Sequence, residues 1–126
     1  MNTEASLVLI VDDDPDIRDA LSVALVADGY LIKATASLLG ATTIMEQEPT
    51  LDYMLLDYNL PGMPLQDFLA RAETLHPRMA VVLISAIDNL AEKAARYKVK
   101  QYLPKPFDFE RLRQMLKKVT AASEKK

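Results

Sequence analysis

Short runs of apolar residues alternate with stretches of helical periodicity along the whole chain. The apolar runs predict strands at residues 7–11, 31–34, 53–56, 80–84 and around 102–103. The first of them, at 7–11, is a continuous run of leucine and β-branched residues, which is typical of a strand buried on both faces of a sheet. After each run, apolar residues recur every three or four positions, which predicts amphipathic helices.

Residues with strong capping preferences mark where several of these helices begin and end. Asp14 is predicted to cap the first helix, with Pro15 at its first position, and Gly29 to end it in a left-handed conformation. Ser37 is predicted to cap the second helix, and Asp108 the last.

The remaining helices are expected after the Pro- and Gly-rich loop at 59–64 and over about 89–97. The apolar face of the helix at 89–97 consists mostly of alanine, at Ala91, Ala94 and Ala95. We expect one domain over residues 1–126, with a core at about 6–120 and a frayed tail at 121–126.

Strand and helix therefore alternate five times. This alternation predicts parallel βαβ units, whose crossovers are right-handed in about 98% of cases. The expected fold is α/β, a five-stranded parallel sheet with helices on both faces, hence a three-layer sandwich. Ligands of such sheets bind at the carboxyl ends of the strands, so that edge is where we expect a site.

Composition excludes several kinds of function. The 126 residues contain no cysteine, which excludes disulfides, thiol nucleophiles and thiolate zinc sites, and a single histidine, His76, which we expect at the surface where a helix ends. A net charge of −3 argues against direct binding of nucleic acid or of an anionic membrane. The acidic N-terminus and the short apolar runs predict a cytoplasmic protein without a secretory signal. Met45, Met54 and Met115 are interpreted as core residues.

Acidic residues, a serine and a lysine follow four of the predicted strands. Asp12 and Asp13 follow the first, Asp57 the third, Ser85 the fourth and Lys105 the fifth. Two carboxylates about 5 Å apart repel each other by roughly 3 kcal/mol at an effective dielectric constant near 20. One lysine does not balance three such charges, so the pattern predicts a hard divalent cation with oxygen ligands, and Mg²⁺ fits best.

These residue types are suited to forming an aspartyl phosphate. Beside a bound metal, one carboxylate can attack phosphorus as a nucleophile. The Ser85 hydroxyl and the Lys105 ammonium can hold the remaining phosphoryl oxygens as charge develops.

Four segments resemble the receiver domain of two-component response regulators. They are IVDDDP at 10–15, LLDYNLPGM at 55–63, LISA at 83–86 and YLPKPF at 102–107. The resemblance covers nearly the whole chain in the right order. It implies a flavodoxin-like sandwich with strand order 2-1-3-4-5 and five helices. It also implies a phosphoprotein of phosphorelay signalling rather than an enzyme, whose phosphorylation and dephosphorylation are self-catalysed.

The resemblance also implies roles for individual residues. Asp57 would be the phosphoacceptor, and Asp12, Asp13, Asp57 and the backbone carbonyl of Asn59 would hold Mg²⁺. Ser85 would bind the phosphoryl group and move on activation.

Three further residues gain a role in the same way. Lys105 would be the family's lysine, and the Lys105–Pro106 peptide bond would be cis. Tyr102, three residues earlier, would be the aromatic switch residue.

The implied partners are proteins. A sensor histidine kinase or a histidine phosphotransfer protein would donate the phosphoryl group from a phosphohistidine. A downstream protein, or a covalently linked output domain outside this chain, would respond to it, and a phosphorylation-dependent dimer is a further option. The sequence leaves open whether the regulator stands alone or is part of a longer protein.

Two departures from the family pattern stand out. Lys98 and Val99 replace the usual Gly-Ala pair before the last strand, so a lysine must adopt a turn conformation that favours glycine. Leu65 stands where a glycine commonly opens the third helix.

Two other functions compete with this interpretation. A haloacid-dehalogenase-like phosphatase would use Asp12 as nucleophile and Asp14 as acid/base, but would leave Asp57 without a role. A flavin electron carrier would place a phosphate in the loop after the first strand, where three acids repel it.

Overall fold

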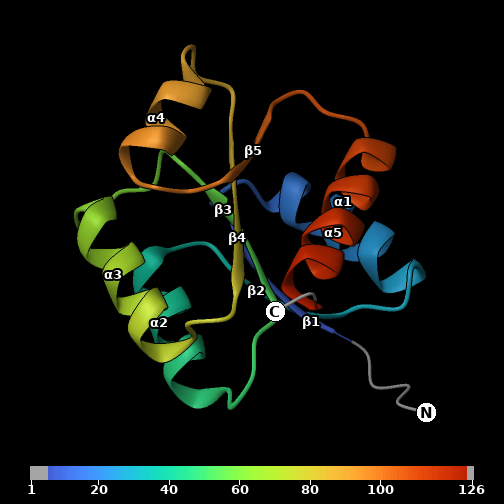
Figure 1. Ribbon diagram of the computed structural model, residues 1–126, viewed down its shortest axis with the longest axis horizontal. Helices are drawn as coiled ribbons and strands as arrows, with labels where there is room; N and C mark the ends of the chain where they lie inside the picture. The colour runs from blue at the N-terminus through green and yellow to red at the C-terminus, as the bar shows by residue number, and fades with distance from the viewer. Residues whose placement is uncertain (1–5, 125–126) are drawn as a thin grey trace.

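The computed structural model describes residues 6–124, with side chains described as far as residue 119 (Figure 1). Its strands are β1 (Leu7–Val11), β2 (Leu31–Thr35), β3 (Tyr53–Asp57), β4 (Ala80–Ser85) and β5 (Gln101–Pro104). Its helices are α1 (Pro15–Ala27), α2 (Leu38–Gln47), α3 (Leu65–Leu75), α4 (Leu90–Arg96) and α5 (Phe109–Glu124). All strand pairs are parallel and the order is β2-β1-β3-β4-β5, which confirms the predicted flavodoxin-like topology.

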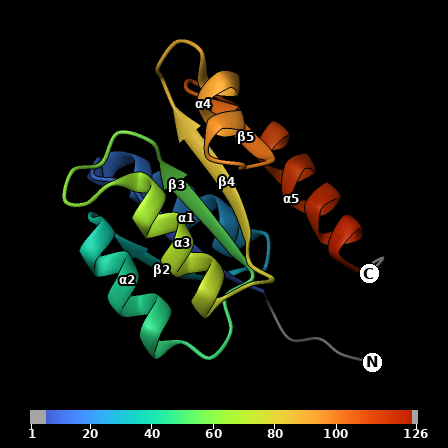
Figure 2. The same cartoon turned by 60° about the vertical axis from the view of Figure 1, so that its left-hand side comes forward.

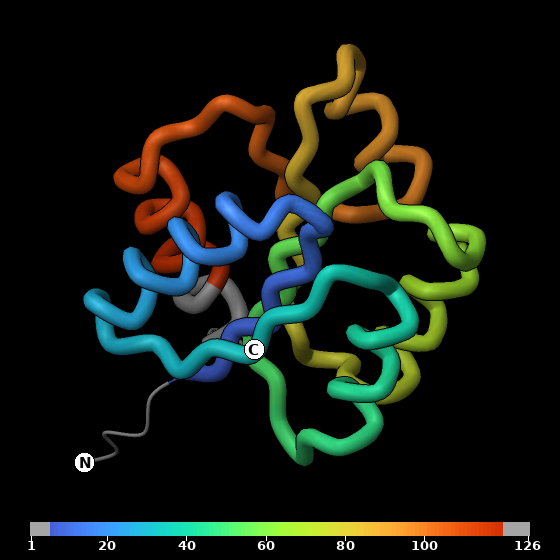
Figure 3. Tube along the Cα trace, turned by 180° about the vertical axis from the view of Figure 1, so that it is seen from behind, coloured from blue at the N-terminus to red at the C-terminus, as the bar shows by residue number. Residues whose placement is uncertain are grey.

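The sheet separates two apolar layers. Helices α2, α3 and α4 cover one face, and α1 and α5 cover the other (Figures 1 and 3). Along β1, Leu9 and Val11 pack against the first group of helices, and Val8 and Ile10 against the second. Burial on both faces explains why β1, β3 and β4 consist of continuous apolar runs up to the polar residue at or after their end, whereas the edge strand β2 contains Lys33 and is mostly exposed.

Strand register brings the polar residues after the strands to one edge of the sheet. Val11 of β1 lies opposite Leu56 of β3, so Asp12 follows directly beside Asp57. On the other side of β3, Asp57 pairs with Ile84, and Ser85 pairs with Pro104 just before Lys105.

The predicted caps are confirmed. The side chain of Asp14 accepts a hydrogen bond from the amide of Asp16 at 2.9 Å, and Ser37 accepts one from Gly40 at the same distance. Asp108 accepts one from Arg111 at 2.7 Å. Gly29 follows α1 with a φ of 99°, a conformation that glycine adopts without steric cost.

The predicted alanine face of α4 is wrong in detail. Leu90 and Ala94 are the residues buried against the sheet, whereas Ala91 and Ala95 are exposed. The helix has only seven residues, so a single i, i+4 pair can face the core.

The C-terminal helix continues to Glu124. Lys125 and Lys126, the last residues of the tail predicted at 121–126, lie outside the described residues. Among the helices within residues 6–124, none has both the length and the apolar composition needed to cross a bilayer.

The prediction that His76 lies at the surface is wrong. Its side chain is buried at 8% exposure, and its Nε2 donates to the backbone oxygen of Met45 at 2.8 Å. In a continuing α2 this oxygen would accept from the amide of residue 49, which is a proline and has none. His76 therefore supplies the donor that Pro49 lacks, and it connects the ends of α2 and α3, which lie side by side (Figure 2).

Lys98 follows the end of α4 in a left-handed conformation. Its φ is 62°, and the two amides after Tyr97 donate to the helix, from Lys98 to Ala95 and from Val99 to Ala94. This is the geometry of a helix C-terminal turn in which glycine is preferred. A side chain in this conformation costs about 1 kcal/mol.

Replacing Lys98 by glycine should therefore stabilise the protein. We expect Lys98→Gly to raise the free energy of unfolding by about 0.5–1 kcal/mol, measured by urea denaturation. Lys100→Gly is the matched control, because Lys100 is also exposed but has no positive φ. That variant should leave stability unchanged or lower it; equal effects of the two substitutions would show that Lys98 is not strained.

Candidate functional site

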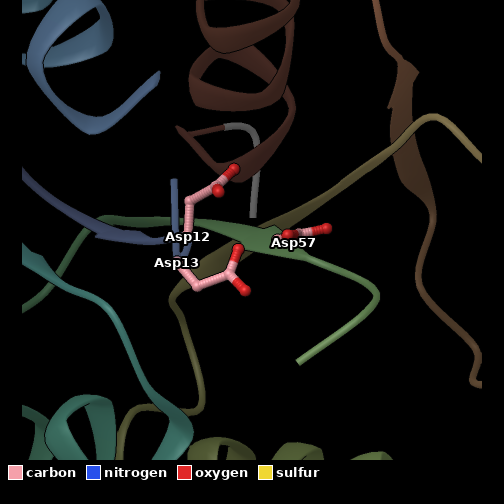
Figure 4. Close-up of side chains that lie close together, drawn as sticks. All are labelled: Asp12, Asp13 and Asp57. Carbon is pink, nitrogen blue, oxygen red and sulfur yellow. The ribbon is translucent and has the colours of Figure 1, made fainter. Parts of the chain in front are cut away.

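Three carboxylates meet at the carboxyl edge of the sheet. Asp12 and Asp13 follow β1 and Asp57 ends β3, and one oxygen from each lies within 4.8 Å of the others (Figure 4). Asp12 and Asp57 are buried, at 3% and 8% exposure, whereas Asp13 is exposed. The structure thus brings together the three acids that the sequence predicted as metal ligands.

Lys105 is the cation beside this cluster. Its Nζ lies 2.9 Å from Oδ2 of Asp12 and 3.9 Å from Oδ2 of Asp57. Its amide donates to the carbonyl oxygen of Ser85 at 2.8 Å, which ties the loop after β5 to the end of β4. The Lys105–Pro106 peptide bond is cis, as predicted.

Burial raises the pKa of Asp57 above its ordinary value. The charges of Asp12 and Asp13 raise the pKa further, while a hydrogen bond from the amide of Asn59, at 3.3 Å, and the Lys105 ammonium lower it. Burial and the two like charges outweigh the hydrogen bond and the single cation. Ionised Asp57 is therefore under-compensated, and a further cation beside it would stabilise the ionised form.

Backbone contacts fix Asp12. Its Oδ1 accepts from the amide of Asp14 at 3.0 Å, and its carbonyl oxygen accepts from Nη1 of Arg18 at 2.7 Å. Arg18 was not predicted as a site residue. It lies one turn after the N-cap of α1, and helical side chains point back towards the N-terminus of their helix, which here is where Asp12 lies. This direction is the only feature of the sequence that could have predicted the contact.

Ser85 and Tyr102 lie near this edge without joining the cluster directly. The Ser85 side chain is buried, and its hydroxyl oxygen accepts a local hydrogen bond from the amide of Ile87 at 3.2 Å. Tyr102 lies on β5 opposite Leu83 and is 38% exposed, so its ring is outside the core.

An aromatic contact that sequence reasoning missed connects the site to α4. Tyr58 directly follows Asp57, and its ring centroid lies 6.2 Å from that of Tyr97 at the end of α4, with the ring planes tilted by 60°. Burial raises the pKa of the Tyr58 phenol, and the neighbouring Tyr97 adds to the increase. Nothing in the sequence links these two residues, because the contact depends on how α4 docks.

The donor set fits a hard divalent cation. All the side-chain ligands are carboxylate oxygens, their summed charge exceeds that of Lys105, and the exposed Asp13 leaves the cluster open to solvent. Cysteine and histidine, which soft metals prefer, are absent from the cluster.

Comparison with known proteins identifies the family. The family described as response regulator receiver domain matches residues 8–117. The "Response regulator protein FleR" of Pseudomonas aeruginosa is 34% identical over 82% of this chain and 22% of its own length. The sensory transduction protein LytT of Bacillus subtilis is 37% identical over 88% of this chain and 46% of its own length. The chain therefore spans less than half of these curated relatives.

Solved structures agree on the fold. A CheY-like receiver domain protein from Methanospirillum hungatei superposes with a TM-score of 0.87 at 26% identity, covering 97% of this chain and 98% of the other. The response regulator TrrA of Thermotoga maritima, solved with Mg²⁺ and BeF, gives a TM-score of 0.79 at 24% identity, covering 90% and 98% of the two chains.

The competing functions gain nothing from these results. None of the similarities supports a haloacid-dehalogenase-like phosphatase with Asp12 as nucleophile, and both oxygens of the Asp12 carboxylate already accept hydrogen bonds, from the Lys105 amine and from the Asp14 amide. Three carboxylates within 4.8 Å are also an unsuitable cradle for a flavin phosphate. The order of the strands, the acidic cluster beside a lysine and the match over residues 8–117 lead to one conclusion: this chain belongs to the response regulator receiver domain family of two-component signal transduction.

Proposed function

We propose that this receiver accepts a phosphoryl group on Asp57. The observation that carries the proposal is the buried, under-compensated carboxylate of Asp57, 3.9 Å from the Lys105 amine and within 4.8 Å of two further acids. We also propose that residues 1–126 form a single receiver domain with its core at about 6–120.

The proposed reaction needs no general base. One Asp57 oxygen attacks phosphorus in line and forms a P–O bond, while the P–N bond of the donor phosphohistidine breaks and the imidazole leaves with its electron pair. In the return reaction, water attacks phosphorus, the P–O bond to Asp57 breaks, and inorganic phosphate leaves. The domain assists both steps on itself and is not an enzyme with a separate substrate.

Asp12, Asp13, Asp57 and the backbone carbonyl of Asn59 are the proposed Mg²⁺ ligands. The oxygen-only donor set and its excess negative charge support this assignment. When bound, Mg²⁺ neutralises the charge of the carboxylates and of the phosphoryl oxygens.

Lys105 and Ser85 are the proposed partners of the phosphoryl oxygens. The Lys105 amine already lies between Asp12 and Asp57 and needs only a small movement to reach a group on Asp57. The Ser85 hydroxyl would turn from the Ile87 amide to the phosphoryl group. Tyr102, partly exposed on β5, would then rotate inwards as the switch residue.

The proposed partners are proteins. The donor is a sensor histidine kinase or a histidine phosphotransfer protein, and an apolar cleft of about 440 Å³ beside Lys105, lined by Ile17, Ala20, Pro106 and Phe107, gives it a docking surface next to Asp57. The recipient is a downstream protein or a linked output domain, with a phosphorylation-dependent dimer as a further option. We place the protein in the cytoplasm, without direct contact to nucleic acid or membrane.

Removal of the Asp57 carboxylate should abolish phosphorylation. Asp57→Asn keeps the size of the side chain but lacks the nucleophilic oxygen, so labelling by acetyl phosphate with Mg²⁺ should fall below detection in intact-mass spectrometry. Asp14→Asn is the matched control, because this exposed neighbour is a cap residue and asparagine caps helices equally well. Labelling of Asp57→Asn at the wild-type rate would assign the phosphoryl group to another residue.

Removal of the Asp13 carboxylate should weaken magnesium binding and phosphorylation together. Asp13 is exposed, so Asp13→Ala should fold normally. We expect Mg²⁺ affinity to fall by about tenfold or more in calorimetric titration, with a parallel loss in acetyl phosphate labelling rate. An unchanged affinity would remove Asp13 from the metal site.

The stability of the protein should depend on the ionisation of Asp57. Folding raises the pKa of Asp57, so the folded protein binds a proton on this carboxyl more tightly than the unfolded chain does. The free energy of unfolding therefore falls as pH rises from the pKa of Asp57 in the unfolded chain to its higher pKa in the folded protein. Asp57→Asn lacks this penalty, so its stability advantage should grow through that window and then level off. Urea unfolding of both proteins in EDTA from about pH 3.5 to about pH 8 measures this. A difference that does not change with pH would contradict it.

A further inference from the structure

A second, larger groove lies at the opposite edge of the sheet from Asp57. It has a volume of about 940 Å³ and is bounded by the C-terminal part of α3, the α4–β5 loop, and Lys118 and Val119 of α5. Its lining includes residues just before β4 and β5, where these strands begin, whereas the carboxylates lie where the strands end.

The groove exists because β5 and α4 are short. Strand pairing between β4 and β5 starts at Val82 with Gln101, so Ala80 and Val81 have no neighbouring strand on that side. Helix α4 has only two turns and ends before it could cover this corner. In Figure 2, α4 and β5 lie towards one end of the molecule, while α3 and β4 continue towards the other.

The floor of the groove is apolar. Leu69 and Ala72 of α3, Met79 and Val81 at the start of β4, and Val99 before β5 all line it. Leu69, Val81 and Val99 are only partly buried, so they offer apolar surface that the fold itself does not cover.

The rim of the groove is basic. Arg96, Lys98, Lys100 and Lys118 line it and are exposed, and Glu73 is the acid among the lining residues. Within residues 6–119, none of these four cations has a carboxylate within salt-bridge distance. The chain as a whole carries a net charge of −3, so this local excess of positive charge is a feature of the groove.

We propose that this groove, formed by α3, the α4–β5 loop and residues 118–119 of α5, docks an acidic, amphipathic segment of a partner protein. Apolar side chains of that segment would cover the floor, and its carboxylates would pair with the free cations of the rim. An apolar floor does not suit nucleic acid, which binds continuous basic surfaces. A concave groove of about 940 Å³ suits a segment with protruding side chains better than a flat membrane.

Such docking leaves Asp57 accessible. The groove and the acidic cluster lie at opposite ends of the strands, so the phosphodonor and this partner can bind at the same time. The two sites share one connection, since Tyr97 lines the groove and packs on Tyr58 next to Asp57. The proposal itself does not require phosphorylation and stands apart from the function proposed above.

The proposal can be tested by selecting peptides that bind the full chain from a random library displayed on phage. The enriched peptides should combine several acidic residues with apolar ones. Fluorescence anisotropy with one labelled peptide should then show a Kd about tenfold or more higher for the double variant Lys100→Glu, Lys118→Glu than for the wild type. Lys117→Glu is the matched control, because Lys117 is exposed on the same helix but does not line the groove. It should bind as the wild type does.

A second variant tests the floor. Val81→Thr makes a partly buried side chain more polar with little change in shape, so it should also weaken binding of the peptide. Circular dichroism checks that the variant is folded. Asp57→Asn should bind the peptide normally, so a failure of the phosphoacceptor assignment and a failure of this proposal are distinguishable.

The proposal would be overturned if the selection enriched no peptides, or if it enriched neutral or basic ones. It would also be overturned if the double variant bound the enriched peptide as tightly as the wild type does. Binding of duplex DNA or of vesicles containing phosphatidylserine that the double variant abolishes, without peptide binding, would replace the protein segment by one of those partners.

Discussion

Repulsion among three carboxylates held next to one ammonium is the constraint around which this domain is built. At 4.8 Å and an effective dielectric constant near 20, each carboxylate pair contributes roughly 3 kcal/mol of repulsion, which Lys105 offsets only in part. The fold withstands this because the three acids extend from β1 and β3, two central strands that are buried on both faces. The same imbalance is the reason why the cluster suits a divalent cation.

Much of the fold follows from local chemistry that can be read from the sequence. Continuous apolar runs predict strands because both faces of this sheet are covered, and Asp14, Ser37 and Asp108 cap helices whether or not the rest of the chain is known. The acids and the lysine could be placed at one edge because parallel strands share a direction. The strand order was not obtained this way, since it came from the family resemblance.

The errors concern residues whose environment depends on how helices dock. His76 looks like a surface residue in the sequence, yet it is buried because Pro49, far away in the chain, leaves the Met45 carbonyl without a donor. The inward face of α4 and the Tyr58–Tyr97 contact depend in the same way on the position of a two-turn helix, which periodicity over seven residues cannot fix.

In the sequence Pro104-Lys105-Pro106, the loop after β5 depends on a single backbone amide for its main-chain hydrogen bonding to β4. Neither proline has an amide hydrogen, so the N–H of Lys105, bound to Ser85, is the sole main-chain donor in the tripeptide. The lysine and the residue that carries the hydroxyl are thus joined through their backbones, and a displacement of either must be shared by the other or break that bond. Deuterium uptake at this one amide would therefore report whether the two act as a unit.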